Sequence, residues 1–289
     1  MKQIIALILT LAICMCLCAC GKSPSVLAVE NAIQAIGEVS IDSKNAIETA
    51  VNLYNALPSK EKDQIDNYYI LEQAQKQYVF ELSKTVYTNV CEAYEMTDAF
   101  ASDIYEGWRI GATEENALFN SDNCAEYLTR KMKLSEDEFR DGIAHRLITT
   151  KSKIDGVRIE YDWETATEED KAYLRSIDYA FLMSCKNDPN KNVFDGILGA
   201  VRSAYIVKGT TEETKVLLEE AKVLMREMSE AYSDYEHYPN LKEFYAKTNS
   251  IFEFCMSPTG TFEQVKITIR DYRNAIRDYK SDLDFIFGE

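Results

Sequence analysis

Residues 69–106 read YILEQAQKQYVFELSKTVYTNVCEAYEMTDAFASDIYE. Neither Gly nor Pro occurs between Pro58 and Gly107, so nothing in this stretch interrupts a helix. Apolar and small side chains recur along it at steps of three and four, namely Val86, Val90, Ala93, Thr97, Phe100, Ile104 and Trp108. The stretch therefore predicts one helix about 57 Å long. We expect a rod with an exposed middle, ending in a packed hinge at Trp108-Arg109, beside Gly107 and Gly111.

The sequence beyond the hinge is also helical in character. Leu134 and Phe139 flank Ser135-x-x-Glu138, which is typical of a capping box with a hydrophobic staple. Two stripes follow, each stepping by three and four residues: Leu217, Ala221, Leu224, Met228, Ala231 and Tyr235, then Phe262, Val265, Ile269, Tyr272, Ile276, Tyr279, Leu283 and Ile286. Such stripes bury one face against neighbouring helices, as in a bundle. The period-two alternation over 157–163 has no evident partner strand, so we interpret it as an extended loop.

The sequence before the rod predicts two shorter helices. Gly37 ends the first helix, Asp42-Ser43 precedes the second, and Asn67 can cap the third at Tyr68. The segments AIGEVSIDS (35–43), A-x-x-x-YNAL (50–57) and NY-x-x-L (67–71) resemble a three-helix module that recurs in secreted and surface proteins of Gram-positive bacteria. The resemblance implies a spacer or interaction module without catalytic residues, in which Gly37, Ile41 and Tyr54 maintain the fold.

The first twenty residues are typical of a secretory leader. Lys2 and the free amine are followed by an apolar run from Ile4 to Leu17, too short to span about 30 Å of hydrocarbon comfortably. The sequence Leu17-Cys18-Ala19-Cys20 resembles the lipobox of bacterial lipoproteins, with Cys18 as a slightly unusual residue. This resemblance implies cleavage after Ala19 and lipidation of Cys20. The alternative is an uncleaved N-terminal anchor helix, and both place the chain outside the cytoplasm.

Together these patterns predict an all-α protein, with a small three-helix module joined by a long helix to a larger helical bundle. We expect a signal peptide over 1–19, a lipidated tether over 20–25, the three-helix module over 26–82, the connecting long helix over 83–110 and the C-terminal bundle over 111–289.

Composition excludes some functions. The net charge of −16 repels phosphate backbones, so we expect no nucleic-acid partner. Four cysteines lie beyond the lipobox, scattered singly and without metal-type spacing. These four are Cys91, Cys124, Cys185 and Cys255. They are either four buried free thiols or two disulfides.

Candidate catalytic groups are few. His145 and His237 are too far apart for a zinc pair, and each has a simpler structural interpretation. Asp188-x-Asn190-x-Asn192 begins like a calcium loop but has Val193 and Gly199 where glycine and glutamate are required. The acidic clusters, which are Glu114-Glu115, Glu136-Asp137-Glu138 and Glu168-Glu169-Asp170, fall in first turns of expected helices, where the helix dipole favours them. We predict no enzyme, cofactor or metal.

The aromatic residues offer a candidate binding surface. Tyr232, Tyr235, Tyr238 and Tyr245 lie in one short segment with several Phe residues, and could stack on sugars or contact a protein. Core packing around a helix corner explains the same residues.

The sequence thus predicts a lipoprotein attached through Cys20 to the extracytoplasmic face of the cell membrane. Its expected role is a non-catalytic scaffold or recognition module for a protein or cell-wall partner. The alternative is a small-molecule binder for uptake or sensing, with a cavity in the C-terminal bundle. A hydrolase acting on envelope material is a third option.

Overall fold

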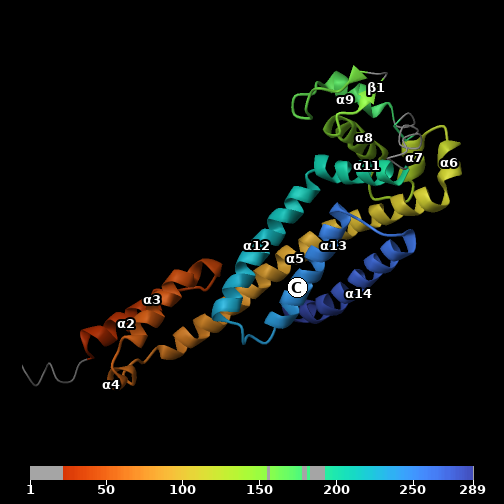
Figure 1. Cartoon of the computed structure of the whole chain (residues 1–289). Coiled ribbons are helices and arrows are strands. Elements are labelled where there is room, and N and C mark those ends of the chain that lie inside the picture. The colour runs from red at the N-terminus through yellow and green to blue at the C-terminus, as the bar shows by residue number, and fades with distance from the viewer. Residues whose placement is uncertain (1–21, 155–156, 178–180, 183–192, 289) are drawn as a thin grey trace, which may run out of the picture. The chain divides into compact units, whose positions relative to one another are not determined.

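The computed structural model describes residues 22–154, 157–177, 181–182 and 193–288. It is 76% helical, with twelve α-helices and one very small sheet in these ranges, which confirms the all-α prediction (Figure 1). The chain divides into two compact units, Met1–Ser83 (unit 1) and Lys84–Glu289 (unit 2). None of the helices in the described ranges is both long and apolar enough to cross a membrane.

Unit 1 contains three main helices. These are α2 (Pro24–Gln34), α3 (Lys44–Asn55) and the first part of α5 (Tyr68–Thr113), with the 3₁₀ turn η1 (Ile41–Ser43) and the short α4 (Ser59–Lys62) between them (Figure 1). Gly37 follows α2 with a φ of 65°, the left-handed conformation that glycine adopts without strain. Apolar side chains form the core, including Val26, Val29, Ile33, Ala50, Leu71 and Tyr78.

The start of α2 differs from the tether expected over 20–25. Ser23 is the N-cap of α2 and its hydroxyl accepts a hydrogen bond from the Val26 N–H at 3.2 Å. Pro24 takes the first helical position, where its missing N–H costs nothing, and the Val26 side chain is fully buried. Helix α2 therefore already occupies part of the range expected for the tether.

Helix α5 differs from the exposed rod that the sequence suggested. It runs unbroken to Thr113, so the expected hinge at Trp108-Arg109 is absent. Its residues in unit 2 include five fully buried side chains, Val86, Val90, Ala93, Phe100 and Ile104. Gly107 has a packing role, because a Cβ there would lie only 3.0 Å from Ile197 Cγ2. From Lys84 onward α5 is therefore a core helix of unit 2. The periodicity showed that one face of this helix is apolar, but it could not show that other helices cover that face along its length.

The other helices of unit 2 form two groups. The first group has α6 (Glu115–Phe119), α7 (Cys124–Thr129), α8 (Glu136–Thr149), α9 (Glu168–Arg175) and α11 (Val193–Val207). The second group has α12 (Thr210–Ala231), α13 (Tyr238–Met256) and α14 (Phe262–Phe287) (Figure 1). Helix α8 packs along α11, α13 packs along α14, and α12 contacts both α11 and α13.

Local signals in the sequence match these helices in most places. Ser135 and Glu138 form the predicted capping box of α8, and the stapling residues Leu134 and Phe139 are both buried. In α14, four residues of the predicted apolar stripe are buried, which are Val265, Ile269, Ile276 and Leu283. In α12 the buried face differs from the predicted one, because Leu218 and Met225 are buried in place of Leu217 and Leu224. The helix also ends before Tyr235, the last residue of the predicted stripe.

The period-two segment also differs from the expected loop. Strands β1 (Lys153–Ile154) and β2 (Val157–Arg158) pair antiparallel, with Lys153 opposite Arg158 and Ile154 opposite Val157. The partner strand is only two residues long, which is too short to show an alternating pattern in the sequence.

Candidate functional site

One lysine and two carboxylates hold together the end of unit 1 where the chain enters. The Lys22 ammonium pairs with Glu30 and donates to Asp66 Oδ2 at 2.6 Å. Glu30 also accepts from the Asp66 N–H at 2.9 Å, and its carbonyl accepts from Asn67 Nδ2 at 3.0 Å. The hydrogen bonds from Lys22 and from the Asp66 backbone lower the pKa of Glu30. This group, which we call the N-terminal junction (Lys22, Glu30, Asp66 and Asn67), fixes the beginnings of α2 and α5 at the same end of unit 1.

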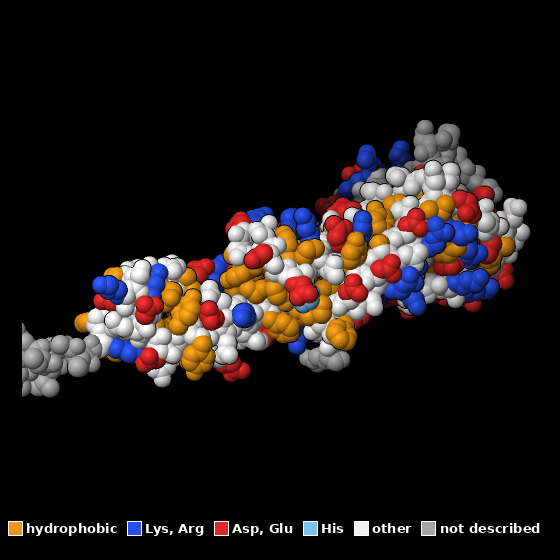
Figure 2. All heavy atoms as spheres, turned by 90° about the horizontal axis from the view of Figure 1, so that it is seen from below, with side chains coloured by type: hydrophobic (Ala, Val, Ile, Leu, Met, Phe, Trp, Pro, Cys, Tyr) orange, Lys and Arg blue, Asp and Glu red, His pale blue; other side chains and the backbone are white. Residues whose placement is uncertain are grey.

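Aromatic and apolar side chains lie in the elements that meet at the junction. Ser25 donates to Glu61 Oε2 at 2.9 Å, which ties α2 to α4. Tyr54 and Tyr68 stack with ring centroids 4.3 Å apart, and the Lys62 ammonium lies 4.9 Å from the Tyr54 ring centre. Leu27 and Tyr69, in the first turns of α2 and α5, are 47% and 59% exposed. Apolar groups thus reach the surface where the fold begins, and Figure 2 shows hydrophobic side chains at the surface of unit 1.

Unit 1 also has a shallow groove of about 560 Å³. Gly37 and Val39 line one side, and the facing residues of α5 are Ile70, Gln73, Ala74, Lys76, Gln77 and Phe80. The lining combines apolar side chains with two amides and an ammonium, as in surfaces that bind peptides or small polar molecules. Gly37, which the family resemblance singled out, therefore both ends α2 and borders this groove.

The four tyrosines of the predicted binding surface are half-buried and face different neighbours. Tyr245 packs against the apolar cluster of Ala93, Leu218 and Phe252, between α5, α12 and α13. Tyr235 instead meets the edge of His237, with ring centroids 5.3 Å apart, in the turn between α12 and α13. Tyr232 also lies in this turn, whereas Tyr238 is the first residue of α13. The burial of Phe252 and Phe244 agrees with the core-packing interpretation of this aromatic segment.

A buried carboxylate joins three elements of unit 2. Asp103 on α5 is fully buried and accepts hydrogen bonds from the backbone N–H groups of Lys133 at 2.6 Å and Leu134 at 3.0 Å. The Tyr205 hydroxyl of α11 donates a third bond at 3.0 Å. Burial raises the pKa of Asp103, although these donors act to lower it. Its hydrogen-bonding capacity is used in fixing α5, the loop before α8 and α11.

Arginines provide further links between helices. Arg273 of α14 donates to Asp98 Oδ1 at 2.5 Å and to Ser102 Oγ at 2.6 Å, both on α5. Arg202 of α11 donates to the Met256 carbonyl at 2.8 Å, at the C-terminal end of α13. These cations therefore hold helix ends and faces together in positions distant in sequence.

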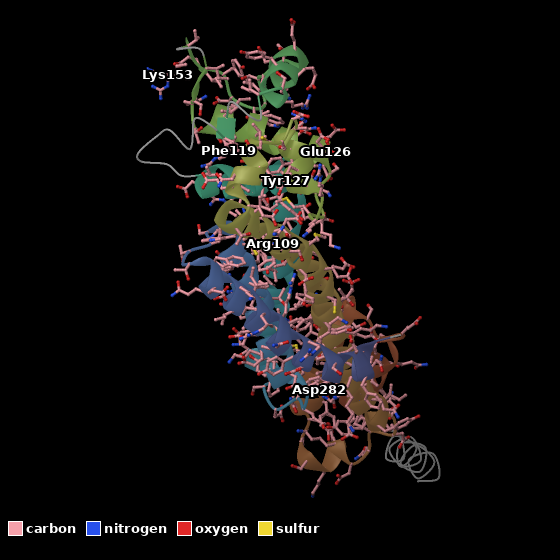
Figure 3. The ribbon with its side chains drawn as sticks, turned by 90° about the vertical axis from the view of Figure 1, so that its right-hand side faces the viewer. Arg109, Phe119, Glu126, Tyr127, Lys153 and Asp282 are labelled. Carbon is pink, nitrogen blue, oxygen red and sulfur yellow. The ribbon has the colours of Figure 1, made fainter. Side chains whose placement is uncertain are left out.

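The candidate catalytic groups also have structural surroundings. His145 on α8 is half-buried with its ring edge toward Trp163, centroids 5.4 Å apart, and burial lowers the pKa of its imidazole. His237 is the N-cap residue of α13. Glu136 and Glu168 begin α8 and α9 as predicted. Glu114 pairs with Arg109 and accepts from Tyr127 at 2.8 Å, which brings the end of α5 and α7 together (Figure 3).

Metal and thiol chemistry is limited in the described part of the chain. It contains no group of three His, Cys, Asp or Glu side chains placed to hold a metal ion. Among the described residues Cys91 and Cys255 form no disulfide, which agrees with their interpretation as free thiols. Burial raises the pKa of both Cys91 and Cys255, so neither is an activated nucleophile. Ala19, Cys20, Cys185 and the 188–192 segment lie outside the described residues.

Sequence reasoning missed the N-terminal junction. Lys22 and Asp66 are 44 positions apart, and no motif or helical spacing connects them. The only available signal was the single cation directly before Ser-Pro at an expected helix start, and that signal does not identify its partners.

Comparison with known proteins gives no assignment. No family model, no curated protein and no solved structure matches this chain.

Proposed function

We propose that this protein is a lipoprotein of the extracytoplasmic face of a Gram-positive cell membrane, cleaved after Ala19 and lipidated on Cys20. The lipobox-like Leu17-Cys18-Ala19-Cys20 motivates the proposal. The observation that supports it most is the N-terminal junction, because the fold is tied down at Lys22, two residues after Cys20. Described, packed structure is therefore present from Lys22 onward, close to the residue that we propose carries the lipid.

The role that fits best is a non-catalytic scaffold or recognition module for a protein or cell-wall partner. In unit 2, Asp103, Tyr205, Arg202 and Arg273 all bond to other helices or loops. Groups engaged in this way maintain helix positions and are not offered to a substrate. The groove of unit 1, between Gly37 and Phe80, is the recognition surface that we favour.

The alternative function required a ligand cavity in the C-terminal bundle. The described residues of this bundle line two shallow grooves. One has a volume of about 280 Å³ and lies beside Tyr272, and the other has about 240 Å³ and lies beside Phe252. Both are smaller than the roughly 300–1,000 Å³ typical of small-molecule sites. Neither of these two grooves therefore offers the cavity that the small-molecule alternative needs.

Lipid labelling tests the anchor. Cells of a Gram-positive host that express the protein are fed a clickable fatty acid, and the parent is compared with Cys20→Ser. We expect label on the parent and none on the variant, together with loss of the lipid-dependent cleavage. Equal labelling of both would overturn the assignment of Cys20, because an upstream leader cysteine would then be the modified residue.

Photocrosslinking on intact cells tests the recognition role. A photoreactive residue replaces Gln77 in the groove or, as a matched control, the exposed Gln34 on α2. We expect a discrete adduct with a protein or a cell-wall fragment from position 77 and none from position 34. Absence of an adduct at position 77 would contradict recognition through the groove.

A further inference from the structure

The distance between the proposed lipid and the fold is very short. Only Gly21 separates Cys20 from Lys22. Two peptide steps place the Cα atoms of Cys20 and Lys22 at most about 7.6 Å apart. The headgroup layer of a bilayer is roughly 5–7 Å deep on each side. With the acyl chains of Cys20 inserted, Lys22 therefore lies within or just above the headgroups.

Lys22 cannot move away from unit 1 without breaking the N-terminal junction. The Lys22 side chain is 27% exposed, and its ammonium pairs with Glu30, whose side chain is only 18% exposed. Asp66 and Asn67 extend the same bonds to the start of α5. The lipid thus restrains the end of unit 1 that contains the first turns of α2 and α5.

That end exposes the side chains that membrane interfaces favour. Leu27 is 47% exposed and Tyr69 is 59% exposed, each in the first turn of its helix. The stacked Tyr54 and Tyr68, with Lys62 over the Tyr54 ring, belong to the same end. Tyrosine and lysine at the level of the headgroups, with aliphatic groups below them, are the usual arrangement of interfacial segments.

We propose that this end of unit 1 docks on the lipid surface, with Leu27 and Tyr69 entering the interfacial layer. The inference rests on the proposed lipidation of Cys20. The contact is apolar rather than electrostatic, because Glu30 and Asp66 already neutralise Lys22. Glu61 and Asp63 likewise offset the charges of Lys60 and Lys62. Anionic lipid is therefore not required, and neutral vesicles suffice. A membrane so close to the chain also supplies a high effective concentration for weak apolar contacts.

Photocrosslinking to lipid tests the docking. The lipidated full chain is purified from membranes, reconstituted in phosphatidylcholine vesicles and illuminated with p-benzoylphenylalanine in place of Tyr69. The matched control carries the same residue in place of Ile41, which follows α2 at the other end of unit 1. Ile41 is 42% exposed, so it lies outside the core and lacks the fold-keeping role that the family resemblance implied. We expect phospholipid adducts at position 69 at least fivefold above position 41, unchanged when the salt concentration is raised.

A second substitution keeps the test specific. Leu27→Asp, on an exposed side chain, should leave the melting curve unchanged and lower the adduct yield at position 69 several-fold. Fatty-acid labelling of the same samples distinguishes a failure of the docking from a failure of the lipid anchor. Labelled protein without lipid adducts overturns the docking but leaves the anchor intact, whereas unlabelled protein overturns both. A protein adduct at position 69 on intact cells, in place of lipid, would also overturn the docking.

Discussion

Units 1 and 2 place their charged groups differently. In unit 1 the ion pairs of the N-terminal junction lie near the surface, where Asp66 is 84% exposed, and the core around Ile33 and Leu71 is apolar. In unit 2 a carboxylate is fully buried at Asp103, and Arg273 links α14 to α5 across a separation of 175 residues. Surface pairs contribute little to stability, whereas removing one partner of a buried group is costly. Unit 1 therefore depends mainly on its apolar core, whereas unit 2 also depends on a buried polar group that joins α5 to other elements.

The largest expected effect comes from dividing α5. A chain beginning at Lys84 should retain helicity and unfold in one cooperative transition, because it keeps the whole buried stripe. A chain beginning at Gly107 loses Val86, Val90 and Phe100, each contributing about 1.5–3 kcal/mol. Together these three side chains account for about 5–9 kcal/mol, which is comparable to the typical stability of a domain, about 5–15 kcal/mol. Circular dichroism melting compares the two chains, and cooperative unfolding of the shorter one would show that α5 is a separable rod.

The next largest effect is expected at Asp103. Asp103→Ala leaves two backbone N–H groups and the Tyr205 hydroxyl unpaired in the interior, which should cost about 3–5 kcal/mol in the free energy of unfolding. Tyr205→Phe is the control, since it removes one donor and should cost about 1 kcal/mol. Urea denaturation measures both. Similar small losses for the two variants would show that the buried carboxylate does not organise unit 2.

The same contrast explains how much the sequence could predict. Helix positions, the α8 capping box and the left-handed Gly37 depend on residues within a few positions of one another, so pattern alone identified them. The N-terminal junction, the Asp103 links and the Arg273–Asp98 pair depend on residues 30 to 175 positions apart. Helical periodicity indicates which face is buried but not which element covers it. The four tyrosines of the predicted binding surface illustrate this limit, because Tyr235 and Tyr245 lie in one short segment yet contact different partners.

Glycine substitutions distinguish steric contact from backbone strain. Gly142 on α8 faces α11 so closely that a Cβ would lie 2.8 Å from the Ala204 nitrogen, and Gly142→Ala should cost about 1–3 kcal/mol. Gly37 in unit 1 has open space around it but a positive φ, so Gly37→Ala should cost about 1 kcal/mol. Replacement by asparagine separates the causes. Gly37→Asn should be tolerated, since asparagine adopts the left-handed conformation, and Gly142→Asn should be worse than alanine. The reverse order in urea denaturation would contradict this assignment.

The smallest expected effect is the pH dependence at His145. Burial holds the pKa of this imidazole below its ordinary value, with Glu164 acting in the opposite direction. The unfolded chain therefore takes up the proton first as the pH falls, so this contribution to stability is present above the unfolded pKa of about 6.5 and is lost on acidification toward the folded value. His145→Phe should flatten that part of the stability profile, and Glu164→Gln should steepen it. The effect is modest because a half-buried imidazole keeps part of its hydration.

Urea midpoints between pH 7 and 5 measure how steeply stability depends on pH. Nuclear magnetic resonance can also follow both imidazoles directly, since the chain has only 2 His. A His145 signal that titrates at or above the ordinary value would show that α8 and Trp163 do not bury the ring in solution.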